Sequence, residues 1–252
     1  MRLGSAVWQE GPAERAALVA QLPSDPGRVV DLNRLEHLRL AKLGEGSPEA
    51  MAEALVPPTL AALLTAGPRA LSRVRQVVAY AEKWHKRSGL PESLAPRAEA
   101  VRFLPCLPRP SVLRRWDGTH LDRLTVQGPG GTLSQLPAPT LALVGQHGGH
   151  PAGCCLAVED GRGVVLGAWL ELDLDWDGEL ELVLGAHRRR LPLDAWRGLA
   201  LPVLRPGEVL LAPPPHLRLP HHGPELKEVR VLAAFETLVL RLGEARVHPT
   251  LQ

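Results

Sequence analysis

The pattern of apolar and polar positions divides the chain into three parts. Residues 1–32 contain three short stretches typical of β-strands, and turn-rich residues at 11–12 and 23–27 separate them. From residue 33 the apolar positions recur with helical spacing and stop at glycines, which commonly end helices. The pattern therefore predicts three strands followed by a helical segment.

The clearest helix is predicted between residue 68 and Gly89. Apolar side chains follow one side of this stretch, and basic side chains crowd the rest of it. Shorter helices are expected after residue 33, after Ser47-Pro48 and over 59–67. We interpret the basic face as a solvated surface rather than a partner surface. Residues 89–100 have the character of a linker.

After residue 101 the pattern becomes that of strands, for example in "PTLALVG", "CCLAV" and "EVRVLAAF". In "LELDLDWD", residues 170–177, apolar and acidic side chains alternate strictly, so the four carboxylates share one face. Neighbouring carboxylates on such a face are about 6.8 Å apart, too far for one cation to contact more than two of them. A solvated strand face is the better interpretation. The whole order predicts a β-dominated α+β protein in two parts.

Composition narrows the class of protein. The chain has 252 residues and a net charge of +2, and 45% of its residues are hydrophobic, which is an ordinary balance for a globular protein. Basic residues are scattered, and no apolar run is long enough for a membrane span, so neither nucleic acid nor membrane is expected as a partner. Three cysteines make a disulfide framework unexpected. The expected location is cytoplasmic.

One short stretch, "QHGGHPAGCC" at 146–155, concentrates candidate metal ligands. A zinc site needs ligand pairs with a spacing that this stretch lacks, and adjacent cysteines point to opposite faces of a strand. The glycines and the proline favour a turn between two strands. We therefore predict a hairpin, with Cys154 and Cys155 reduced, one buried and the other exposed.

Several stretches, taken in order, resemble the fumarylacetoacetate hydrolase family, although common catalytic motifs such as G-x-S-x-G are absent. These stretches are "RVVDLN", "EALVPPTLAALLTAG", "FLPCLPRPSVLRRW", "LGAWL", "LRPGEV" and the final "ELKEVRVLAAFETLVLRLG". No single stretch is specific, but their order extends over nearly the whole chain. The resemblance implies a rolled core of mixed β-sheet at 101–252 and a small β and helical N-terminal domain at 1–100. It also implies small oxo-acid or β-diketo-acid substrates, as in aromatic catabolism, and a homodimer.

The family uses Mg²⁺, Mn²⁺ or Ca²⁺ held by carboxylates, and here the matching positions depart from that pattern. By the resemblance, Arg115 stands in place of a ligand aspartate, and Ala138 and Thr140 stand in place of two glutamates. We find no counterpart of the remaining aspartate. A hard divalent cation needs such oxygen ligands, so no metal cofactor is expected. Asp117 and His120 would be relics of catalytic residues, and Arg115 and Thr140 would bind substrate.

The leading hypothesis is a catalytically inactive member, a pseudoenzyme, that binds a small organic acid or pairs with an active relative in a hetero-oligomer. A second hypothesis is an active hydrolase, isomerase or decarboxylase of oxo-acids with a rebuilt site, using Asp117, His120, His147 or His150. A third, from another class, is a pure protein-interaction module that assembles through "LELDLDWD" or the basic helix.

Overall fold

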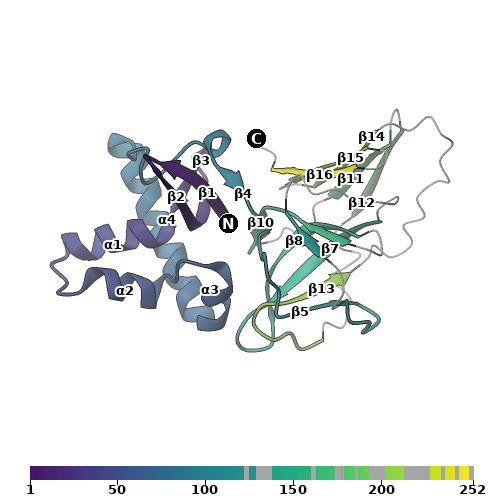
Figure 1. The fold of residues 1–252 in the computed structure, drawn as a ribbon, viewed down its shortest axis with the longest axis horizontal. Helices are drawn as coiled ribbons and strands as arrows, with labels where there is room; N and C mark the ends of the chain where they lie inside the picture. The colour runs from purple at the N-terminus through teal and green to yellow at the C-terminus, as the bar shows by residue number, and fades with distance from the viewer. Residues whose placement is uncertain are drawn as a thin grey trace.

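The structure is a computed structural model in which the helical part and the strand-rich part lie side by side (Figure 1). It describes residues 1–121, 125–128, 138–159, 163–173, 177, 179–184, 187–192, 194, 202–212, 228–233, 236–241 and 244–249. Within these residues, no helix is long and apolar enough to cross a membrane.

The N-terminal part contains the predicted three strands and the predicted helices. The strands are β1 (Arg2–Glu10), β2 (Ala13–Leu22) and β3 (Asp25–Asp31). The helices are α1 (Leu32–Lys42), α2 (Pro48–Leu55), α3 (Leu60–Ala66) and α4 (Pro68–Ser88), followed by a short 3-10 helix, η1 (Ala98–Ala100). The side chain of Asp31 caps α1 by accepting a hydrogen bond from the backbone N–H of Arg34 at 3.0 Å.

The rest of the described chain is built of strands. The first set is β4 (Arg102–Phe103), β5 (Val112–Arg115), β6 (Thr125–Gln127), β7 (Ala138–Gly145), β8 (Pro151–Glu159), β9 (Gly163–Leu166) and β10 (Trp169–Glu171). The second set is β11 (Glu179–Leu184), β12 (His187–Pro192), β13 (Glu208–Ala212), β14 (Glu228–Ala233), β15 (Glu236–Arg241) and β16 (Glu244–Pro249).

Strands from both parts form one mixed sheet. Its 11 strands run in the order β3-β2-β1-β10-β8-β7-β13-β5, with β4 beside β1, and with β9 between β8 and β6. Strand β5 is parallel to β13, whereas the strands along β7, β8 and β10 are antiparallel. A second sheet has the order β12-β11-β14-β15-β16. These sheets confirm the predicted class, a β-dominated α+β fold with a mixed core.

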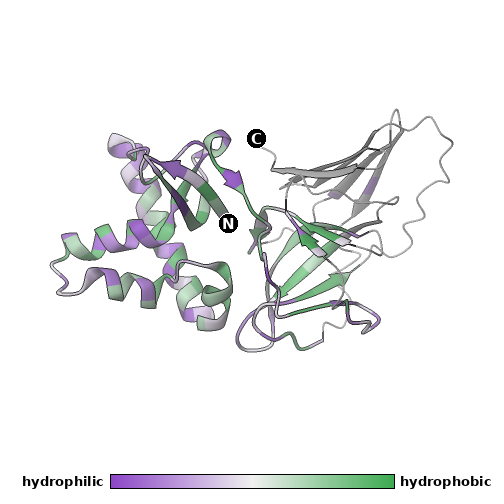
Figure 2. Cartoon of the chain, viewed as in Figure 1, coloured by the Kyte–Doolittle hydropathy of each residue, from purple (hydrophilic) through white to green (hydrophobic). Residues whose placement is uncertain are grey.

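Apolar burial explains why the helices lie on the sheet. Hydrophobic residues follow β7, β8 and β13, whereas the helices alternate hydrophobic and hydrophilic positions (Figure 2). One core cluster joins side chains of β1, β2 and the helices to side chains of β7, β8 and β13. The predicted division at residue 100 stays a prediction, although the sheet and this cluster continue across it.

A buried ion cluster fixes α1 against α4. The side chain of Glu36 is 0% exposed, and its carboxylate accepts hydrogen bonds from Arg39 on α1 and Arg73 on α4, both at 2.8 Å. Burial of a carboxylate is tolerated only when such partners compensate the lost hydration. The cluster therefore links two helices that are neighbours in space but not in sequence.

The seam between β1 and β10 is closed by Trp169. This side chain is fully buried, and its ring lies 4.8 Å, between centroids, from Phe103. Gly4 pairs with Trp169 across the seam, and a Cβ at Gly4 would lie 2.8 Å from the carbonyl oxygen of Ala168 and 3.1 Å from the indole ring. Because Gly4 has no side chain, the indole of Trp169 can occupy this space.

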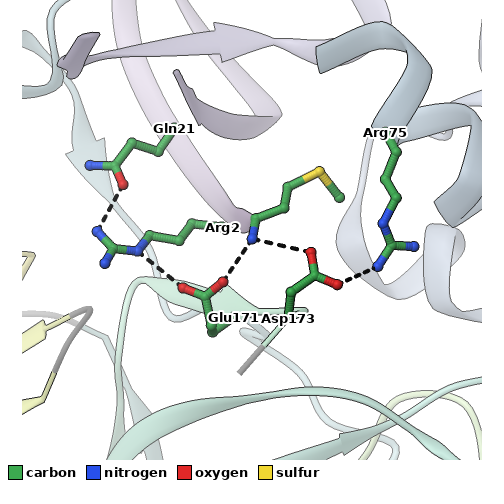
Figure 3. A network of polar contacts seen from close by, with 6 residues as sticks. Arg2, Gln21, Arg75, Glu171 and Asp173 are labelled. Atoms are coloured by element: carbon green, nitrogen blue, oxygen red, sulfur yellow. Dashed lines mark hydrogen bonds and ion pairs between the residues drawn. The ribbon is translucent and has the colours of Figure 1, made fainter. Parts of the chain in front are cut away.

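The acidic stretch after Trp169 takes part in a polar network rather than a solvated strand face (Figure 3). Glu171 is only 9% exposed; it accepts hydrogen bonds from the amino group of Met1 at 2.8 Å and from Nε of Arg2 at 3.1 Å. Asp173 accepts from the same amino group and from Arg75 on α4. The solvated interpretation was wrong for Glu171, because the amino group of Met1 and the side chain of Arg2, on the neighbouring strand β1, cover its carboxylate. Asp173 is exposed, as that interpretation expects. Residues 174–176 lie outside the described residues.

Asp173 is expected to make a small part of the stability depend on acid. Burial raises the pKa of its carboxyl. The hydrogen bond from Arg75 and the positive charges of the Met1 amino group and Arg75 together lower the pKa by more than burial raises it, so the pKa lies below its usual value. This contribution is therefore present above the unfolded-state pKa and is lost as the pH falls through the lower folded-state pKa. It should be less than about 1 kcal/mol, because exposed ion pairs are screened.

Urea unfolding of Asp173→Asn between pH 3 and pH 6 measures this contribution. The variant should lose stability near pH 6 and converge with the parent protein at the acid end. Glu45→Gln, at an exposed position after α1, is the control. A constant difference between Asp173→Asn and the parent at every pH would contradict the assignment.

Candidate functional site

Three of the stretches that carry the family resemblance lie against one another in the fold. The backbone N–H of Ser111 donates to the carbonyl of Gly207 at 2.8 Å, and its hydroxyl donates to the carbonyl of Pro206 at 3.1 Å. Strand β5 then pairs with β13, and Arg114 forms an ion pair with Glu208. From the same segment, the N–H of Cys106 donates to the carbonyl of Gly167, two residues before Trp169. Segments 104–116, 166–170 and 204–209 therefore form one structural unit.

Strand β5 ends in a tight turn that positions Arg115. The N–H of Arg115 donates to the carbonyl of Thr119 at 2.9 Å, and the N–H of Gly118 donates back to the carbonyl of Arg115 at 3.0 Å. Gly118 has a φ of +87°, a conformation that glycine adopts without strain. The turn leaves Arg115 at the last position of β5, beside Leu211 of β13.

Register places Arg115, Thr140 and Glu159 on one face of the sheet. Arg115 pairs with Leu211, Leu211 pairs with Ala142, and Thr140 is two positions before Ala142 on β7. On β8, Ala157 pairs with Thr140, and Glu159 is two positions further along. Since side chains two positions apart share a face, the two predicted substrate-binding residues and Glu159 lie on the same face.

Arg115 and Glu159 form an ion pair across that face. Nε of Arg115 donates to Oε1 of Glu159 at 2.8 Å, and Nη2 of Arg115 contacts the same oxygen. The hydrogen bond and the charge of Glu159 outweigh the effect of burial and raise the pKa of Arg115, with a smaller contribution from the charge of Asp117. The guanidinium is thus held charged and fixed in direction.

One edge of this guanidinium is already used, and the other is still available. The Nε side faces Glu159, whereas Nη1 has no hydrogen-bond partner among the described residues. The side chain of Arg115 is 39% exposed, compared with 11% for Glu159. An arginine in this state can still offer donors to a carboxylate from solution.

The predicted catalytic relics lie at the tip of the turn. Asp117 is exposed, and its Oδ1 accepts the N–H of Thr119 at 2.9 Å; this hydrogen bond lowers the pKa of its carboxyl. His120 is exposed and pairs with Arg114, so its side chain lies on the opposite face of the sheet from Arg115. The turn brings Asp117 near Arg115 but does not direct His120 to the face of Thr140 and Glu159. Their catalytic roles stay predictions.

The stretch 146–155 forms the predicted hairpin. Strands β7 and β8 are antiparallel neighbours, and Gly148 and Gly149, both with positive φ, are in the turn between them. The N–H of His147 donates to the carbonyl of Leu64, so the turn contacts the end of α3. Among the described residues, no group of three or more His, Cys, Asp or Glu side chains could hold a metal. A further pair of adjacent histidines in the sequence, His221 and His222, lies outside the described residues.

The prediction that one cysteine of the adjacent pair is exposed was wrong. Cys154, Cys155 and Cys106 are all free thiols, and each is at most 1% exposed. Both faces of β8 are covered over Cys154–Val158, so alternation of side chains does not bring either thiol to solvent.

The three thiols should therefore react slowly with a thiol reagent in the native protein. A colorimetric disulfide reagent is expected to modify no thiol rapidly under native conditions and all three after denaturation, because a thiol must reach solvent to react. Cysteine introduced at exposed Ser88 provides a fast-reacting control. Rapid native modification of any of the three would contradict the packing of β8.

No protein family matches the sequence, and no curated protein matches it in sequence. A hexagonal crystal form of 2-keto-3-deoxyarabinonate dehydratase is similar in structure, with a TM-score of 0.47 and 9% identity, over 99% of this chain and 98% of that chain. The complex of 2-keto-3-deoxy-D-arabinonate dehydratase with magnesium and 2,5-dioxopentanoate has a TM-score of 0.46 and 11% identity, over the same shares of the two chains.

Glu159 is the residue of this face that the sequence did not single out. It follows the apolar strand "CCLAV" and reads as an ordinary polar residue at the end of a strand. Its partner Arg115 is 44 positions away in sequence. Only the pairing of β8 with β7, and of β13 with β5, brings the two charges together.

Proposed function

We propose that this chain is a fumarylacetoacetate-hydrolase-like protein that binds small oxo-acids at Arg115 and lacks metal-dependent catalysis. The observation that carries the proposal is the Arg115–Glu159 ion pair on the same sheet face as Thr140. The resemblance assigns metal-ligand positions to Arg115 and Thr140, and a guanidinium now holds the nearby carboxylate. The contact between segments 104–116, 166–170 and 204–209 further supports the resemblance.

A divalent cation does not fit this set of side chains. Mg²⁺ binds through several oxygen ligands, and the carboxylate of Glu159 is already neutralised by Arg115. A cation at about 4 Å from the guanidinium would also meet a repulsion of roughly 1 to 4 kcal/mol per unit charge, depending on the local dielectric constant. Magnesium, present in the complex of the similar dehydratase, is therefore not part of the function proposed for this chain.

A small organic acid fits better than a cation. The unused Nη1 edge of Arg115 can donate two hydrogen bonds in a geometry that matches a carboxylate, and Glu159 holds that edge in a fixed direction. Oxo-acids are favoured over other acids by the resemblance alone. Because the side chains of this face do not fit a metal and its described residues include no His that could activate water, we expect the bound acid to be held without turnover.

A second candidate is an active enzyme with a rebuilt metal site. The buried carboxylate of Glu159 favours it, because this residue would become a ligand if Arg115 turned away. The charge of Asp117 also acts on Arg115, so a second carboxylate is in the neighbourhood of this arginine. The two candidates differ in which solute stabilises the protein.

Thermal unfolding in the presence of separate solutes tests the proposal. Millimolar pyruvate or 2-oxobutanoate should raise the melting temperature by mass action, whereas Mg²⁺, Mn²⁺ and Ca²⁺ should not. Arg115→Gln should weaken acid binding about tenfold, as expected for loss of a charge-assisted hydrogen bond. Arg97→Gln, at an exposed arginine that pairs with Arg28 of β3, at the opposite end of the sheet order from β5, should leave it unchanged.

Two results would reject the proposal. A clear rise in the melting temperature of the parent protein with divalent cations would favour the active enzyme with a rebuilt site. Acid binding that survives Arg115→Gln would place the acid elsewhere.

Assembly is a separate part of the proposal. We expect a homodimer, or a hetero-oligomer with an active relative, and a measurement of the mass in solution tests this expectation.

A further inference from the structure

A segment outside this sheet face separates two hollows in the described part of the structure. Residues 104–109 run from β4 towards β5, and Pro108 and Arg109 line both hollows. The first, here the apolar hollow, has a volume of about 320 Å³ and lies between this segment, the β1–β2 hairpin and the start of α3. The second, the polar hollow, has a volume of about 380 Å³ and lies beside Ser111 and Leu121.

The apolar hollow is lined almost entirely by hydrocarbon. Its walls include Ala16 of β2, Pro58, Leu60 of α3, Leu104 and Leu107. The small side chain of Ala16 on β2 leaves this space, whereas the side chains of Ala6 and Ala17 point to the other face of the hairpin, where they pack in the core around Trp169. The volume is within the range of about 300–1,000 Å³ that is typical of small-ligand sites.

Arg109 is the one charged residue among the described residues that line the two hollows. Arg109 is exposed, and no ion pair or hydrogen bond connects its side chain to another described residue. The described residues that line the two hollows include no acidic side chain. Within the described part of the chain, the charge of Arg109 beside the apolar hollow is therefore not compensated.

We infer that the apolar hollow binds a monocarboxylic acid with a compact apolar body, and that Arg109 holds its carboxylate. The apolar walls bury the hydrocarbon part, and the planar guanidinium pairs with the anionic head. Ser5 and Thr59, which also line the hollow, bring hydroxyl groups to its wall. This site does not use Arg115 or Glu159, so it is independent of the function proposed above.

Calorimetric titration with 3-phenylpropanoate tests the inference, with 3-phenylpropanamide and acetate as probes of the two halves of the ligand. The acid should bind, and the uncharged amide and the headgroup alone should each bind at least about tenfold more weakly. Arg109→Gln should lower the affinity for the acid to that for the amide. Arg87→Gln, at an exposed arginine at the end of α4, should change neither.

A second pair of variants tests the place of the ligand. Ala16→Phe should fill the apolar hollow and abolish binding of acid and amide alike, whereas Ala13→Phe, on the same strand but outside the hollow, should not. Melting curves check that each variant is folded. If Ala16→Phe does not fold, Arg109→Gln still tests the inference. Equal affinity for acid and amide, binding unchanged in Arg109→Gln, or no binding of the acid would each overturn the inference. Loss of binding in Arg115→Gln instead would assign the acid to the other site.

Discussion

Replacing Trp169 by alanine should lower the free energy of unfolding by about 3–5 kcal/mol, the usual cost of removing a fully buried large aromatic side chain. The indole is 0% exposed, packs on Phe103 and occupies the space that Gly4 leaves open. Its loss would leave a cavity at the seam that joins β1 to β10. Equilibrium unfolding in urea measures the change.

Two further variants locate the effect at the seam. Trp169→Phe should cost clearly less than alanine, since it keeps an aromatic ring against Phe103. Leu43→Ala removes an apolar side chain that is 65% exposed and should change stability little. A cost for Trp169→Ala no larger than that for Leu43→Ala would show that the seam is not packed as described.

Replacing Glu36 by alanine should cost about 3 kcal/mol, because removing one partner leaves the buried ends of an ion cluster uncompensated. We expect a value near the lower limit for such changes, since the side chains of Arg39 and Arg73 are each more than 20% exposed and can regain some water. Urea unfolding again measures the loss. The link between α1 and α4 should weaken at the same time.

The matched control is Glu53→Ala, which removes an exposed glutamate from α2 and should be nearly neutral. Amide hydrogen exchange should show faster exchange in α1 and α4 in Glu36→Ala than in Glu53→Ala. Equal exchange in the two variants would mean that Glu36 does not join the helices.

The local elements could be predicted from the sequence because their signals are local. The Ser47-Pro48 pair marks the start of α2, the turn-rich residues from 23 onward mark the end of β2, and the glycine after α4 marks the end of that helix. The hairpin between β7 and β8 follows from Gly148, Gly149 and the apolar runs around them. The class of fold then follows from the order of the elements.

The candidate site could be predicted only in part, because its geometry depends on distant pairings. Arg115 and Thr140 were selected by resemblance, and register places them on one face. Glu159 was missed, since nothing near it in sequence indicates an arginine partner. Glu171 and the thiol pair were misjudged for one reason: alternation along a strand does not tell whether one face or both are covered.

The pairing of β1 with β10 has a consequence for how the chain folds during synthesis. Leu3 meets its sheet neighbour Leu170 only after all the residues between them have been translated. Until then the edge of β1 at residues 2–4 exposes unpaired backbone groups, which can pair with other chains. Contacts this distant in sequence slow folding, since a large loop must close before they form. The interval between the synthesis of α4 and the synthesis of residue 171 is thus the period in which this edge of β1 is most open to pairing with other chains.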